Sequence, residues 1–116
     1  RGLGDVYKRQ VVLELNDDFS ERQPLARLWG ETEWLKAALA LAEGSVGEAR
    51  RAYVMSALDA VAALELYLRA APSGLWRDKM LADGSFVEEP APASSLYHIV
   101  CAISELDAVS ARLLKQ

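Results

Sequence analysis

His98, the one histidine among the 116 residues, is the side chain best suited to proton transfer. An imidazole accepts and releases protons near neutral pH, which is what a general acid/base must do. A lone histidine close to the start of a helix is also a common structural residue that only makes a hydrogen bond. Its residue type therefore makes His98 a candidate catalytic group, and its position alone leaves the structural role open.

Trp29 and Glu33 lie four residues apart, so on a helix they share one face. Trp76 lies in the loop that Pro72 and Gly74 predict. Tryptophan rings stack on the apolar faces of sugar rings, and a carboxylate can bind sugar hydroxyl groups. The three residues are candidate substrate-binding groups, although tryptophans also serve simply as core residues.

The stretch between residues 78 and 89 is rich in carboxylates: Asp78, Asp83, Glu88 and Glu89. Two carboxylates on either side of a glycosidic bond are the catalytic pair of most glycosidases. A run of acidic residues in a loop is more often a solvated surface. A glycosidase with a pair of catalytic carboxylates is therefore the last of the alternative functions.

Other chemistries find little support in the residue types. The chain lacks a glycine-rich phosphate loop, a G-x-S-x-G motif and a C-x-x-C motif, and one cysteine with one histidine cannot form a structural zinc site. We therefore predict neither a metal nor a cofactor. A net charge of −4 disfavours nucleic acid and anionic membranes as partners. Apolar runs fall far short of the roughly 20 residues of a membrane span, and nothing indicates an oxidising compartment, so we expect a cytoplasmic protein.

The chain is long enough for one domain, and its 52% hydrophobic content supplies a core. A β-branched run predicts a strand over residues 11–15, followed by a polar loop that includes Pro24. Apolar periodicity predicts a helix over 30–43, closed by Gly44 in the left-handed conformation, and a second helix over 46–71. The second helix is apolar on two sides, which favours a larger two-layer helical assembly.

Residues 75–89 predict a small hairpin around Asp83 and Gly84. Ser94 is the expected N-cap of a third helix over 95–114, in which His98 points away from the main core. The expected buried stripe of this helix consists of Leu96, Ile99, Val100, Ile103, Leu106, Leu113 and Leu114.

Residues 1–10 show no helical or strand periodicity and resemble a translated sequencing-adapter tail. We therefore expect a non-native tail over 1–10. The rest, 11–116, is expected to be one C-terminal fragment of a longer protein.

Two stretches together resemble the C-terminal part of the N-acylglucosamine 2-epimerase family: ARLWGETEWLKAALALAE at 26–43 and GLWRDKMLADGSFVEEPAPASSLYHIVCAISEL at 74–106. The family includes mannose isomerases and mannose 6-phosphate isomerase-like proteins. The resemblance implies an all-α fold, here the C-terminal part of an (α/α)6 barrel with about three helices and a short β-hairpin. The sequence departs from the family at Gly30 and Glu31, where relatives usually have proline and glutamine.

The resemblance also implies a reaction, namely epimerisation or isomerisation of a small sugar by two histidines that exchange protons, without metal or cofactor. His98 stands where the histidine of the last helix should be, and the second histidine belongs to an upstream segment. Trp29, Glu33 and Trp76 are then the substrate-binding residues. A second copy of the full-length protein, forming a homodimer, is the expected protein partner. The alternative from another class is a non-catalytic helical interaction module.

Overall fold

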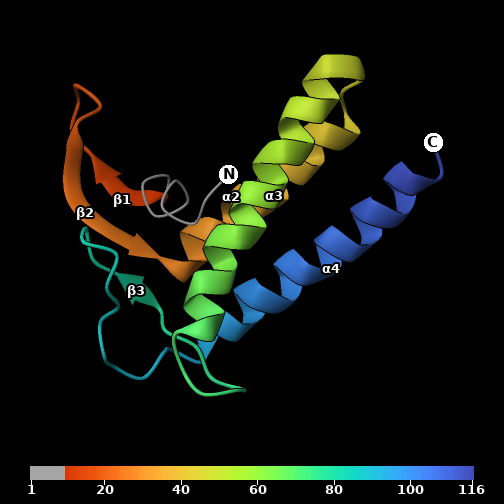
Figure 1. Ribbon diagram of the computed structural model, residues 1–116. Helices are drawn as coiled ribbons and strands as arrows, with labels where there is room; N and C mark the ends of the chain where they lie inside the picture. Colours follow the sequence, from red (N-terminus) through yellow and green to blue (C-terminus); the bar gives the residue numbers. More distant parts are fainter. Residues whose placement is uncertain (1–9) are drawn as a thin grey trace.

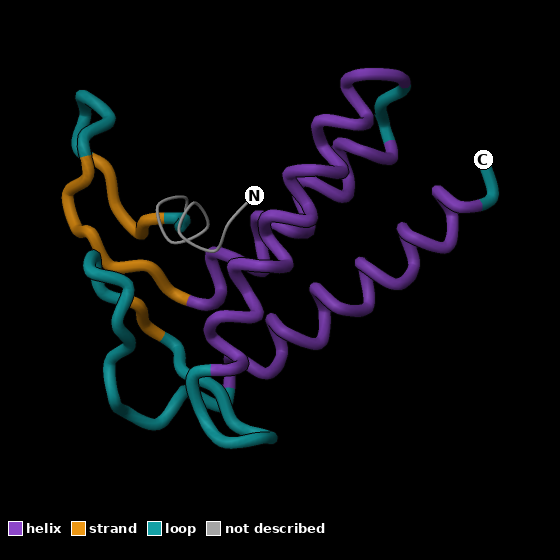
Figure 2. The backbone as a smooth tube through the Cα atoms, viewed as in Figure 1, coloured by secondary structure: helices purple, strands orange, loops and turns teal. Residues whose placement is uncertain are grey.

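The computed structural model describes residues 10–116, so all but the last residue of the expected tail over 1–10 lies outside the described residues. The described part consists mainly of three helices, with a small antiparallel sheet at one end (Figure 1). In chain order the elements are β1 (Val12–Leu15), β2 (Glu21–Arg27), α2 (Leu28–Glu43), α3 (Gly47–Arg69), β3 (Lys79–Met80) and α4 (Ser94–Leu114). The helix α2 packs against both α3 and α4, while the sheet lies beside the start of α2 (Figure 2).

The strand β1 confirms the prediction for residues 11–15, but β2 replaces part of the predicted loop. Pro24 lies inside β2, where it cannot donate a hydrogen bond. The sheet tolerates it because the register with β1 shifts there: Val12 pairs with Ala26, whereas Glu14 pairs with Gln23. The third strand pairs only with the last two residues of β2. Pro24 therefore sits at an irregular position with a neighbour on one side only.

The helix α2 begins two residues earlier than predicted because another segment satisfies its first backbone donor. The Leu28 N–H donates to Asp78 O at 2.9 Å, and the N-cap residue, Arg27, makes no side-chain cap. The helix ends before Gly44, as predicted, but Gly44 has φ −82° and is not left-handed. The left-handed glycine is Gly47, with φ +61°, where α3 begins.

The core has two parts. One lies between the helices and is built around Leu35, Leu39 and Val109. The other lies between the sheet and the helices, where Tyr67 packs edge-on against Phe86 with ring centroids 5.1 Å apart. The helix α3 contributes to both parts, which accounts for its apolar residues on two sides.

The helix α4 is rotated relative to the predicted stripe. Ser94 is its first helical residue and Ala93 its N-cap, so the predicted capping role of Ser94 is wrong. Of the predicted stripe, Ile99 is buried, whereas Leu96, Val100, Ile103 and Leu114 are about half exposed or more. The buried face carries Ser95, Ile99, Ala102 and Val109. Small residues allow α4 to approach α2 closely, and a single neighbouring helix covers only this narrow face.

The predicted hairpin around Asp83 and Gly84 is present in reduced form. Gly84 adopts φ +87°, and Leu81 N–H donates to Ser85 O at 2.8 Å across the turn. The second extended run adds only one bridge, between Met80 and Phe86. The first run pairs with β2, so the hairpin is part of a three-stranded sheet and is not an independent unit.

Candidate active site

The N-terminal turns of α2 and α4 bring three of the predicted site residues together. Trp29 and Glu33 belong to α2, and His98 belongs to α4. The ring centroids of Trp29 and His98 are 6.4 Å apart with planes tilted by 39°. The Nδ1 atom of His98 lies 3.7 Å from Glu33 Oε1. We refer to Trp29, Glu33 and His98 as the histidine cluster.

The imidazole of His98 is partly exposed, with 34% of its side-chain surface accessible. Its Nδ1 atom is nevertheless buried and has no hydrogen-bond partner among the described residues. The 3.7 Å separation from Glu33 is too long for a hydrogen bond. Tyr97 packs edge-on against the ring at a centroid distance of 5.7 Å. The accessible surface of the imidazole therefore lies on atoms other than Nδ1, and a reacting molecule would approach from that side.

Lys36 is a residue of this site that the sequence analysis missed. Its Nζ lies 2.9 Å from Glu33 Oε1, the same oxygen that faces His98. The hydrogen bond to Glu33 raises the pKa of Lys36, so the ammonium form persists. The Lys36 ammonium therefore partly neutralises the Glu33 carboxylate that lies beside His98. The three-residue spacing between Glu33 and Lys36 on a helix was the signal that could have revealed the pair.

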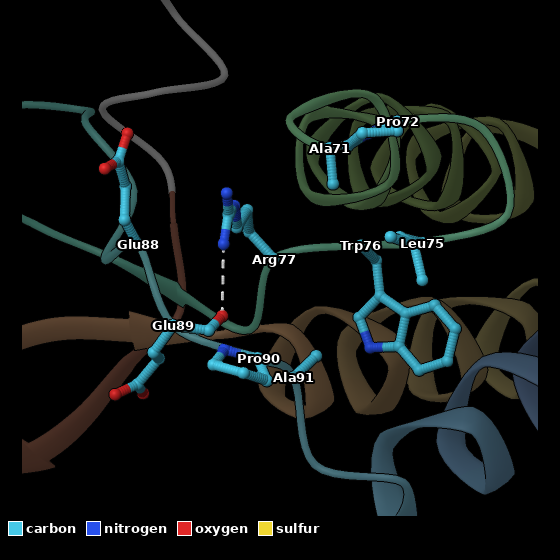
Figure 3. A pocket seen from close by; sticks show the side chains of 9 residues that line it. All are labelled: Ala71, Pro72, Leu75, Trp76, Arg77, Glu88, Glu89, Pro90 and Ala91. Carbon is cyan, nitrogen blue, oxygen red and sulfur yellow. Dashed lines mark hydrogen bonds between the residues drawn. The ribbon is translucent and has the colours of Figure 1, made fainter.

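Trp76 lines a separate hollow between the end of α3 and the segment before α4 (Figure 3). The lining of this hollow does not include the histidine cluster. The indole N–H of Trp76 donates to Ser95 Oγ at 3.0 Å, and Ser95 precedes His98 by one turn of α4. Trp76 is thus anchored to the same helix end as His98, although the hollow that it lines does not include the histidine cluster.

The carboxylates between residues 78 and 89 do not form a catalytic pair. Asp78 is only 2% exposed, and its carboxylate accepts hydrogen bonds from Arg27 Nε and Nη2 at 3.0 and 2.7 Å. Asp83 accepts from the hydroxyl and the backbone N–H of Ser85, which lowers the pKa of Asp83. Glu89 pairs with a lysine ammonium. Asp78 and Asp83 therefore stabilise a strand end and a turn.

A sequence profile of the N-acylglucosamine 2-epimerase (GlcNAc 2-epimerase) family matches residues 5–102. The chain belongs to this family. The family resemblance expected from the two motif stretches is thereby confirmed.

One curated relative of this epimerase-family chain is a mannose-6-phosphate isomerase from Rhizobium meliloti (strain 1021). The two are 59% identical over 97 residues, which cover 84% of this chain and 25% of the relative. The chain thus spans about a quarter of the relative's length. No solved structure matches the chain. Within residues 10–116, no helix combines the length and the apolar character that crossing a bilayer requires.

Glu31, which replaces the glutamine usual in the epimerase family, is fully buried two residues before Glu33. Its Oε1 accepts a hydrogen bond from Val11 N–H at 3.1 Å, and its Oε2 has no partner among the described residues. Burial raises the pKa of Glu31 to about 7, against the opposing effects of Val11 N–H and the Tyr67 hydroxyl. Near neutral pH a large fraction of this carboxyl therefore carries a proton. The sequence analysis singled out Glu31 only as a departure from the family pattern.

Proposed function

We propose that this chain is the C-terminal part of an (α/α)6 barrel enzyme, a sugar 2-epimerase or aldose–ketose isomerase, in which His98 is a general acid/base. The family supports the reaction class. The observation that carries the role of His98 is its position beside Glu33 and Trp29, with the rest of the ring accessible.

The reaction starts from the open-chain sugar. A base removes the proton from C2, the electrons of that C–H bond form the C1–C2 double bond, and the carbonyl electrons move to O1. The result is an enediolate. Returning a proton to C1 while the carbonyl forms at C2 gives the ketose, whereas returning it to the opposite face of C2 gives the epimer. His98 removes or returns one of these protons, and the reaction involves no net oxidation or reduction of the substrate.

Glu33 and Trp29 support this role in different ways. Glu33 Oε1 lies 3.7 Å from Nδ1, so the carboxylate flanks the imidazole, and it can accept hydrogen bonds from sugar hydroxyls. Trp29 is 39% exposed, so part of its ring is available for stacking on a sugar. Trp76, from the adjoining hollow, completes the wall of the sugar site.

The substrate in this proposal is mannose or mannose 6-phosphate, following the name of the Rhizobium meliloti relative. Inversion at C2 needs a proton donor on each face of the enediolate, so a second acid/base must come from outside this chain. A homodimer of the full-length protein is compatible with this arrangement.

The test is the substitution His98→Asn in the full-length protein that carries this chain. We expect kcat to fall by about 10²- to 10⁴-fold, because an amide cannot exchange protons at carbon, while circular dichroism shows an unchanged fold. Turnover in D₂O gives a second readout, since proton exchange introduces solvent deuterium into the product.

The matched control is Glu105→Gln, an exposed position on the same helix, which should leave kcat unchanged. Undiminished turnover and deuterium incorporation in His98→Asn would refute the catalytic role of His98.

A second candidate is a non-catalytic helical interaction module. It is favoured by the row of half-exposed apolar residues on α4, namely Leu96, Val100 and Ile103. A chain of this kind should be a monodisperse helical monomer by itself and should not bind a hydrophobic dye. Self-association and dye binding of the 116-residue chain therefore distinguish the two candidates.

A further inference from the structure

The hollow that contains Trp76 has a volume of about 390 Å³ and lies outside the histidine cluster. Trp76 and Arg77 line it together with Pro72 and Pro90 (Figure 3). Trp76 offers an apolar ring whose orientation is held by the hydrogen bond from its N–H to Ser95. The hollow therefore combines a fixed aromatic wall with a cation.

Arg77 is held in place but is not neutralised. Its backbone N–H donates to Tyr67 O at 3.0 Å, which anchors it to the end of α3. Its Nη1 donates to the backbone oxygen of Glu89 at 3.2 Å. Among the described residues no carboxylate lies within ion-pair distance of its guanidinium. The remaining N–H groups are thus free to bind an anion.

Two glutamates also line the hollow, but neither counteracts Arg77. Glu89 is paired with Lys79, whose Nζ lies 2.7 Å from its Oε1. In Figure 3 the carboxylates of Glu88 and Glu89 point away from the Trp76 ring. Neither carboxylate therefore lies between the indole and the guanidinium in this view.

We propose that this hollow binds the phosphoryl group of a phosphorylated sugar, with Arg77 as its ligand. A guanidinium binds phosphate oxygens through two parallel hydrogen bonds, and the Trp76 ring covers the adjoining carbon chain. The bond from Trp76 to Ser95 joins the hollow to the helix end that carries His98. This inference rests on the proposed function: the far end of a hexose 6-phosphate lies in the hollow while its C1 and C2 reach the histidine cluster.

The test is calorimetric titration of the full-length protein that carries this chain with mannose 6-phosphate, mannose and inorganic phosphate. Arg77→Gln removes the charge and shortens the side chain while leaving a polar amide. We expect this substitution to weaken binding of mannose 6-phosphate by about tenfold or more and to leave binding of mannose unchanged. The matched control is Arg51→Gln, which removes one charge from an exposed position in the first half of α3.

The outcomes separate this inference from the proposed function. If mannose 6-phosphate and inorganic phosphate bind Arg77→Gln as tightly as the parent protein, the phosphoryl site is refuted, whether or not His98→Asn abolishes turnover. If phosphate binding depends on Arg77 but His98→Asn keeps full activity, the site stands and the role of His98 fails. Weakening by Arg51→Gln to the same extent would show that only overall charge matters and would also overturn the proposal.

Discussion

At the scale of single residues, the buried Glu31 departs from the ordinary ionisation state of a carboxyl group. The family resemblance implies glutamine at this position, an uncharged side chain of the same length. A carboxyl with a pKa of about 7 holds its proton through the mildly acidic range, so it too is uncharged there. The site thus tolerates the change from amide to acid because burial suppresses the ionisation.

This leads to a pH-dependent stability. The carboxyl has an ordinary pKa of 4.5 when unfolded and about 7 when folded, so the folded state binds more protons between these values. The stabilisation is complete below about pH 4.5 and is lost as the pH rises to about 7, by on the order of 3 kcal/mol. Urea denaturation at several pH values should show this decline, and Glu31→Gln should remove most of it.

The control for this experiment is Glu21→Gln, at an exposed position of β2, which should follow the parent protein at every pH. A parent protein whose stability is flat between pH 5 and pH 8, or a Glu31→Gln variant that declines equally, would contradict the role of Glu31.

At the scale of elements, the start of α2 depends on β3 and the residue before it. Asp78 supplies the backbone oxygen for the first N–H of α2, and its side chain pairs with Arg27, the N-cap residue. This contact fixes the end of α2 that carries Trp29 and Glu33. Asp78 therefore positions the part of the histidine cluster that lies on α2, although it is far from that helix in the sequence.

Substitution of Asp78 by asparagine should destabilise the protein by about 2–4 kcal/mol, because it leaves the half-buried Arg27 without its counter-charge. Chemical denaturation measures this loss. The double variant Asp78→Asn with Arg27→Met should be less destabilised than the sum of the single variants, since the unpaired charge is gone.

The matched comparison is the exposed pair between Arg22 and Glu14, at 3.6 Å. The substitution Glu14→Gln should cost less than about 1 kcal/mol, because exposed ion pairs contribute little. Equal losses for Asp78→Asn and Glu14→Gln, or strictly additive effects in the double variant, would show that the Asp78 contact does not organise the helix start.

At the scale of the whole molecule, the helices leave apolar surface exposed. Leu96, Val100 and Ile103 follow one another along α4 and are about half exposed. Met55 and Leu58 are similarly exposed on α3. Half a helical layer without its neighbours would present such surfaces, in keeping with a chain that spans about a quarter of its relative's length.

The 116-residue chain by itself should therefore self-associate and bind a hydrophobic dye such as ANS. The double substitution Val100→Lys and Ile103→Lys should reduce both effects while helicity is retained, because these side chains are not in the core. Analytical ultracentrifugation, dye fluorescence and circular dichroism measure the three properties.

The contrasting variant is Ile99→Lys, which places a charge at a buried position and should unfold the chain. A parent chain that stays monomeric across a wide concentration range and binds no dye would favour the independent interaction module over the barrel fragment.

The sequence by itself determined the local features of this protein. Apolar periodicity located α2 and α3 to within two residues at each end, and the turn at Asp83 and Gly84 followed from residues that tolerate its backbone angles. The motif around His98 indicated the family. These features are encoded in neighbouring residues, so they can be recognised without knowing the fold.

The tertiary structure decided everything that depends on distant partners. Pro24 lies in a strand because the register shift beside it leaves an irregular place in the sheet. The helix α4 turns its small residues inward, toward α2 and the alanines of α3. The raised pKa of Glu31 and the approach of His98 to Glu33 likewise arise from packing between segments far apart in the chain. Burial and electrostatics act through space, and residue spacing along one helix does not report them.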